Sequence, residues 1–139
     1  MPTGRSPRIL IVDDEASIRA LLSRALREKG YDVVALNDGA SGLEAVLTAT
    51  DSYDLVVTNN CMPGMDGREL VARIRAARPG LPIVHLDDMS GPPDLDLPAD
   101  VPNVTKPFPI ESLVSRVEEM LPPARRGRAR SLPSATVSL

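Results

Sequence analysis

The chain has 139 residues, of which 42% are hydrophobic and 25% charged, as expected for one soluble domain with a single core. Its single cysteine excludes an internal disulfide, and its apolar runs are too short to span a bilayer. The start also lacks the apolar stretch of a secretory signal, so we expect a cytoplasmic protein without a membrane partner.

The net charge of −3 hides a strong asymmetry. Residues 122–139 contain four arginines and no acid, so the other 121 residues must carry −7. The basic stretch is rich in arginine, serine and proline and has little to bury, which predicts disorder. We therefore expect a flexible N-terminus (1–7), one folded domain (8–121) and a basic tail (122–139). Aromatic residues make up only 2% of the chain, so nucleic acid is not the expected partner.

Apolar runs and amphipathic stripes alternate along the chain. Residues 8–12 (RILIV) form a continuous apolar run, which is typical of a strand buried on both faces. Residues 16–29 carry one apolar stripe and end at Gly30, which predicts a helix. The later predicted elements are a strand at 31–36, a helix at 39–48 capped by Asp38, a strand beginning at Leu55, a helix at 68–78, strands at 82–86 and 103–106, and a helix from Pro109 to Leu121.

This alternation predicts an α/β fold. We expect a flavodoxin-like, doubly wound, five-stranded parallel sheet in the order 2-1-3-4-5, with helices on both faces. Residues 88–102 should hold the fourth helix, but they contain four prolines and a glycine. Proline and glycine both oppose a helix, so this helix should be short or absent.

Polar residues follow the apolar strands at their carboxyl ends. The parallel topology should gather them at one edge of the sheet. Carboxylates and a backbone carbonyl there would suit Mg²⁺, and a lysine could neutralise a carboxylate or contact a phosphoryl oxygen. The gathered residues are Asp13, Asp14, Asn59, Asp87, Asp88 and Lys106.

Four segments in this order make the chain resemble the receiver domain of bacterial response regulators in two-component (phosphorelay) signalling. They are ILIVDDE (9–15), YDLVVTN…MPGMDG (53–67), LPIVHL (81–86) and KPF (106–108), and the resemblance covers roughly residues 8–121.

The resemblance implies a role for each matched position. Asp13 and Asp14 match the acid pair that holds Mg²⁺, and the Cys61 carbonyl matches a further ligand. Asn59 falls on the aspartate that accepts the phosphoryl group, and Lys106 on the lysine that pairs with it. An amide oxygen could still coordinate Mg²⁺, but without a full charge the affinity should be weakened.

Four positions depart from the family pattern. The neutral amide of Asn59 is a poor nucleophile. Asp87 stands where the family has the switch Thr or Ser, Asp88 where it has a small residue, and Asn103 where it has an aromatic. An ionised Asp87 would repel an incoming phosphate by a few kcal/mol at ~4 Å and an effective dielectric near 20. We also hypothesise that Lys106 pairs with Asp87 and locks the domain in one state.

These departures predict a degenerate, pseudo-receiver-like, single-domain interaction module that is not an enzyme and is not phosphorylated at Asn59. Its expected partner is a histidine kinase or another signalling protein, bound through the first or last helix, and the oligomeric state is not indicated. One alternative is a receiver phosphorylated on another carboxylate, Asp87 or Asp14. Another is an Asp-to-Asn change introduced at position 59, although Asp87, Asp88 and the missing helix argue against it. A third alternative is nucleic-acid binding through the tail.

Overall fold

The computed structural model describes residues 6–49, 53–89 and 97–121, so the predicted tail lies outside the described residues. Strands and helices alternate as predicted, with boundaries within one residue of those expected. Asp38 caps its helix as predicted, because its Oδ1 accepts the Ser41 backbone N–H at 2.7 Å. The elements are β1 (Arg8–Val12), α1 (Ala16–Glu28), β2 (Asp32–Leu36), α2 (Gly39–Thr48), β3 (Leu55–Asn59), α3 (Gly67–Ala77), β4 (Ile83–Asp87), β5 (Asn103–Thr105) and α4 (Ile110–Met120).

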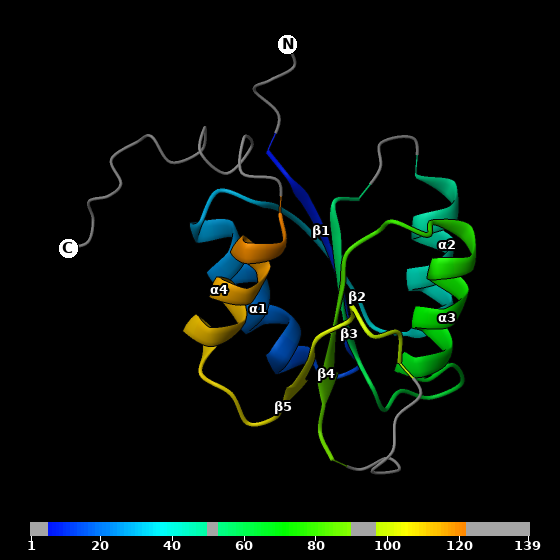
Figure 1. Ribbon diagram of the computed structural model, residues 1–139. Coiled ribbons are helices and arrows are strands. Elements are labelled where there is room, and N and C mark those ends of the chain that lie inside the picture. The colour runs from blue at the N-terminus through cyan, green and yellow to red at the C-terminus, as the bar shows by residue number, and fades with distance from the viewer. Residues whose placement is uncertain (1–5, 50–52, 90–96, 122–139) are drawn as a thin grey trace, which may run out of the picture.

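The five strands form one parallel sheet in the order β2-β1-β3-β4-β5. Helices α1 and α4 cover one face, and α2 and α3 cover the other (Figure 1). This is the predicted flavodoxin-like topology. Because β1 and β3 are neighbours, the residues that end them reach the same edge of the sheet.

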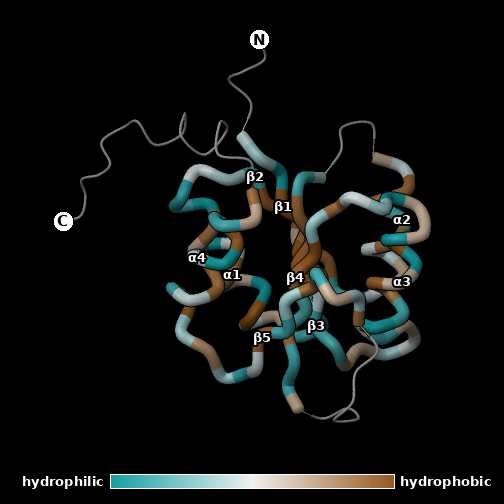
Figure 2. Tube along the Cα trace, viewed as in Figure 1, coloured by the Kyte–Doolittle hydropathy of each residue, from teal (hydrophilic) through white to brown (hydrophobic). Residues whose placement is uncertain are grey.

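Each face of the sheet has its own hydrophobic core. Ile9 and Ile11 of β1 lie in the cluster with α1 and α4, whereas Leu10 and Val12 lie in the cluster with α2 and α3. Successive side chains of a strand point to opposite faces, so a continuous apolar run is buried on both. Figure 2 shows the hydrophobic residues concentrated along the central strands. None of the described helices is both long and apolar enough to cross a membrane.

The connection between β4 and β5 contains no helix in its described residues, 88–89 and 97–102. Leu97 and Val101 pack there against the core beneath α2 and α3. The expected loss of the fourth helix is confirmed for this part of the connection. Residues 90–96 lie outside the described ranges.

Gly67 lets the start of α3 pass directly against the end of β3. Its backbone N–H donates to the Asn60 carbonyl at 2.8 Å. A Cβ at this position would lie 2.2 Å from the Asn59 carbonyl oxygen and 2.8 Å from the Asn60 Cα. Glycine is therefore required for this approach, which helps to fix the backbone of both asparagines.

Candidate functional site

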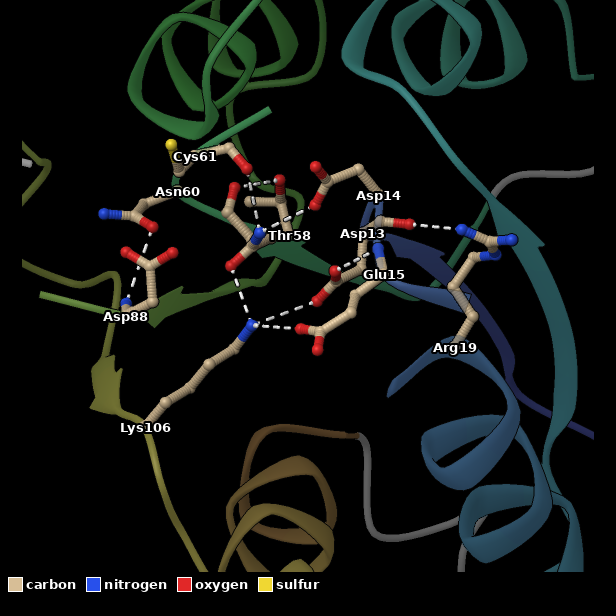
Figure 3. A network of polar contacts seen from close by, with 10 residues as sticks. Asp13, Asp14, Glu15, Arg19, Thr58, Asn60, Cys61, Asp88 and Lys106 are labelled. Atoms are coloured by element: carbon tan, nitrogen blue, oxygen red, sulfur yellow. Dashed lines mark hydrogen bonds and ion pairs between the residues drawn. The ribbon is translucent and has the colours of Figure 1, made fainter. Parts of the chain in front are cut away.

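The carboxyl edge of the sheet carries the predicted polar residues. Asp13 follows β1, Asn59 ends β3, Asp87 ends β4 and Lys106 follows β5. Figure 3 shows the lysine side chain reaching from the β5 side toward the acids that follow β1. The structure thus brings the predicted Mg²⁺ ligands (hereafter the cradle: Asp13, Asp14 and the Cys61 carbonyl) close to the lysine. The predicted site residues nevertheless fall into two separate hydrogen-bond networks.

The first network centres on Lys106. Its Nζ donates to Asn59 Oδ1 at 3.0 Å and lies 3.4 Å from Asp13 Oδ2 and 3.9 Å from Glu15 Oε1. The hypothesis that Lys106 pairs with Asp87 is therefore wrong. The lysine reaches across the end of β3 to the acids that follow β1, while other groups bind the Asp87 side chain.

Both ends of the Asn59 amide are used. Its Nδ2 donates to the Cys61 carbonyl at 3.0 Å and to Asp14 Oδ1 at 3.3 Å, while its Oδ1 accepts from Lys106. These partners fix which end is nitrogen, because the first two are acceptors and the lysine is a donor. The side chain is 3% exposed, so its polar atoms are held within the protein.

Asp13 is the fully buried acid of the pocket. Burial raises its pKa above the ordinary value, and the backbone N–H of Glu15 and the Lys106 ammonium oppose that rise. The Glu15 N–H donates to its Oδ1 at 2.9 Å. The Arg19 guanidinium donates to its backbone carbonyl at 2.8 Å, which ties the end of β1 to α1. Asp14, by contrast, is exposed at the pocket mouth.

The second network centres on Asp87. Its Oδ1 accepts from Asn60 Nδ2 at 3.2 Å and from the Met89 backbone N–H at 2.8 Å. Its Oδ2 accepts from Asn103 Nδ2 at 3.1 Å. The exposed Asp88 adds a longer contact, from its backbone N–H to Asn60 Oδ1 at 3.5 Å. The carboxylate therefore joins the residue after β3, the end of β4 and the start of β5.

His85 extends the second network into the core. Because Asn103 Nδ2 faces Asp87, its Oδ1 faces the ring and accepts from His85 Nδ1–H at 2.8 Å. Burial lowers the pKa of His85, and the contact with Asn103 acts against that shift. The histidine is thus neutral and packed, and its buried Nε2 has no hydrogen-bond partner among the residues that the structure describes.

The Asn59 amide does not fit the divalent cation that the family resemblance implies. The expected ligands, the Asp14 carboxylate and the Cys61 carbonyl, both receive N–H groups from Asn59. A cation at those oxygens would meet amide hydrogens instead of a free cradle. Among the described residues, no three His, Cys, Asp or Glu side chains are grouped to hold a metal.

Sequence reasoning missed three contributors to the two networks. Asn60 is not among the predicted site residues, yet it is buried and bonded to Asp87. Glu15 directly follows the acid pair as the N-cap residue of α1, and Arg19 lies within α1, but their sequence positions do not show which atoms they contact. The sequence signal for Asn60 is its position directly after Asn59 at the polar end of β3, because such an edge gathers polar side chains from neighbouring strands.

Comparison with known proteins gives a consistent picture. A family model for the response regulator receiver domain matches residues 9–118. The response regulator receiver protein CpdR of Brucella abortus is 35% identical over 117 residues, covering 82% of this chain and 96% of CpdR. The transcriptional regulatory protein PrrA of Mycobacterium tuberculosis is 37% identical over 145 residues, and the match covers all of this chain but only 60% of PrrA.

Solved structures agree. The receiver domain of the hybrid histidine kinase CckA is 30% identical with a TM-score of 0.71, covering 83% of this chain and 99% of that chain. The response regulator TrrA of Thermotoga maritima, solved with Mg²⁺-BeF, is 34% identical with a TM-score of 0.74 and the same coverage. Because the match runs from β1 into α4 and spans every strand end of the pocket, this chain belongs to the response regulator receiver domain family.

Proposed function

We propose that this receiver domain acts in two-component signalling as a pseudo-receiver: a protein-interaction module that takes up no phosphoryl group at Asn59. The observation that supports the proposal most strongly is the Asn59 amide, which donates to Asp14 and the Cys61 carbonyl and accepts from Lys106. In this proposal the domain is not an enzyme.

The chemistry of the acceptor position supports this reading. Accepting a phosphoryl group requires an anionic oxygen nucleophile, and a carboxamide is neutral. The one oxygen that Asn59 offers also points at the Lys106 ammonium, 3.0 Å away. That contact lowers the nucleophilicity of the amide oxygen further.

The switch positions support it as well. The family resemblance places a hydroxyl at position 87 and an aromatic at position 103, where this chain has Asp87 and Asn103. These two side chains bind each other at 3.1 Å, and Asp87 also binds Asn60. Where the family resemblance implies a side chain that moves toward a phosphoryl group, this chain has a hydrogen-bonded cluster.

The proposed partner is a histidine kinase or another signalling protein, bound through the α1 and α4 side. Both helices cover the same face of the sheet (Figure 1), and α1 presents Leu21, which is 48% exposed. The chain supplies a matched control, because Leu47 of α2, on the opposite face, is equally exposed at 48%. Leu21→Glu should weaken binding to the histidine kinases of the same genome, whereas Leu47→Glu should not.

The decisive test is the intact mass of the protein after incubation with acetyl phosphate and Mg²⁺. We expect no gain of a phosphoryl group. The double variant Asn59→Asp with Asp87→Thr is the positive control and should gain one group, because it restores the anionic acceptor and the hydroxyl. A gain on the unmodified chain, mapped to Asp14 or Asp87, would establish the alternative of a receiver that uses another carboxylate.

A further inference from the structure

We propose that the amide nitrogen of Asn59 replaces the divalent cation of this pocket, so that the cradle is assembled by hydrogen bonds and does not take up Mg²⁺. The inference rests on the proposed function, in which Asn59 takes up no phosphoryl group. It adds a physical reason why the pocket would not bind Mg²⁺. The N–H groups of Asn59 point at the oxygens that would hold the cation, and this effect is separate from the negative charge that an amide lacks.

The first step concerns geometry. A carboxamide nitrogen carries two hydrogens and can therefore serve two acceptors at once. In this pocket the acceptors are the Cys61 carbonyl at 3.0 Å and Asp14 Oδ1 at 3.3 Å. One side chain thus holds together the loop after β3 and the acid after β1, as a cation between the same oxygens would.

The second step concerns the other end of the amide. For its oxygen to coordinate a cation at the cradle, Asn59 would have to turn over and place Nδ2 against the Lys106 ammonium. Oδ1 now lies 3.0 Å from that ammonium, so the turn would exchange a hydrogen bond for two donors facing each other. A carboxylate has no such conflict, because both of its oxygens accept. With an amide at position 59, the lysine contact and cation coordination exclude one another.

The third step separates this explanation from a purely electrostatic one. If the pocket lacked Mg²⁺ affinity only because Asn59 brings no charge, removing the amide would change nothing. If the N–H groups themselves occupy the ligand oxygens, removing them should allow Mg²⁺ to bind, because Asp13, Asp14 and the Cys61 carbonyl remain. Asn59→Ala therefore distinguishes the two explanations.

The experiment titrates MgCl₂ into the full chain by calorimetry, with thermal unfolding at matched ionic strength as a second readout. We expect no binding by the unmodified chain at millimolar Mg²⁺ and clear, saturable binding by Asn59→Asp in the same concentration range. Asn59→Ala should also gain binding, although more weakly than the aspartate variant. Asn103→Ala, which removes an amide from the other network, should stay unresponsive.

Two results would overturn the inference: Mg²⁺ binding by the unmodified chain with the affinity of Asn59→Asp, or an alanine variant that folds and stays unresponsive. If the alanine variant does not fold, ¹⁵N-resolved NMR spectra of the unmodified chain provide the test. The side-chain NH₂ signals of Asn59, identified by their loss in Asn59→Asp, should not shift with MgCl₂, and a saturable shift would refute the proposal. Mg²⁺ binding without a phosphoryl mass gain would refute this inference alone, whereas a mass gain would refute the proposed function.

Discussion

Lys106 Nζ donates to Asn59 Oδ1 at 3.0 Å, a bond between the residue that follows β5 and the residue that ends β3. The same ammonium lies 3.4 Å from the fully buried carboxylate of Asp13. One cation therefore satisfies an amide oxygen and compensates a buried acid. The stability of the pocket should depend strongly on this lysine.

Lys106→Met should lower the free energy of unfolding by about 1–3 kcal/mol, because it leaves Asp13 buried without its cation. The lysine side chain is only 15% exposed, so solvent screens the pair weakly. Chemical denaturation measures the change. Lys29→Met is the matched control, since Lys29 is exposed at the end of α1, and it should change stability by less than about 0.5 kcal/mol. Equal losses in the two variants would contradict this role of Lys106.

Asp87→Ala should be destabilising for a reason unrelated to Lys106. It removes the acceptor of Asn60 and Asn103, at an expected cost of about 1–3 kcal/mol. A double-mutant cycle with Asn103→Ala should show coupling of about 0.5 kcal/mol or more, whereas a cycle with Lys106→Met should be additive. Coupling to the lysine in place of Asn103 would restore the salt-bridge hypothesis that the structure contradicts.

His85 should make the stability sensitive to mild acid. Burial lowers its pKa from 6.5, so below that pH the unfolded chain binds more protons than the folded one. The free energy of unfolding should therefore keep its full value above pH ~6.5 and fall as the pH drops. His85 can account for at most about 1.4 kcal/mol of this fall per pH unit. His85→Gln cannot titrate and should lose this part of the slope in unfolding experiments between pH ~8 and ~5. Identical slopes for the two proteins would show that His85 does not contribute.

The histidine does not act in isolation. The Asn103 amide binds its ring, and the charges of Asp87, Asp66 and Arg68 also influence it. The pH series therefore needs Asn103→Ala as a companion variant. Its amide stabilises the protonated form of His85, so its removal should steepen the loss of stability on acidification.

Gly67→Ala should destabilise the protein by about 1–3 kcal/mol, through overpacking. The new Cβ would lie 2.2 Å from the Asn59 carbonyl oxygen, which is backbone and has little freedom to move aside. Gly80→Ala is the control, because a Cβ at that position meets no atom of the described part of the chain within 4 Å. Comparing the melting temperatures of the two variants separates the clash with the Asn59 backbone from the general effect of replacing a glycine by alanine. Equal melting temperatures would contradict the steric argument.

The sequence predicts the fold and the location of the site well, because both depend on local patterns. The apolar run of β1 and its abrupt end at Asp13 indicate a buried strand and a polar edge, and Asn59 ends β3 in the same way. Parallel topology then brings the two residues together without further information.

The choice of partners within the site could not be predicted in the same way. Lys106 lies within reach of several acids, and only the three-dimensional path of its side chain shows that it passes over Asn59 to Asp13. The bond between His85 and Asn103 likewise depends on the register of β4 and β5, which pairs these two residues. The register of the two strands is set by the packing of the whole sheet, and the sequence of either strand alone does not determine it.

Asn59 differs from an aspartate by one atom group, NH₂ in place of O, with almost the same shape. Hydrolytic loss of ammonia from this side chain would thus place a carboxylate of almost the same shape at position 59. At 3% exposure, with hydrogen bonds at both ends, the amide carbon is shielded from attacking water. The hydrogen bonds that hold the Asn59 amide in place should therefore also slow its direct hydrolysis to aspartate.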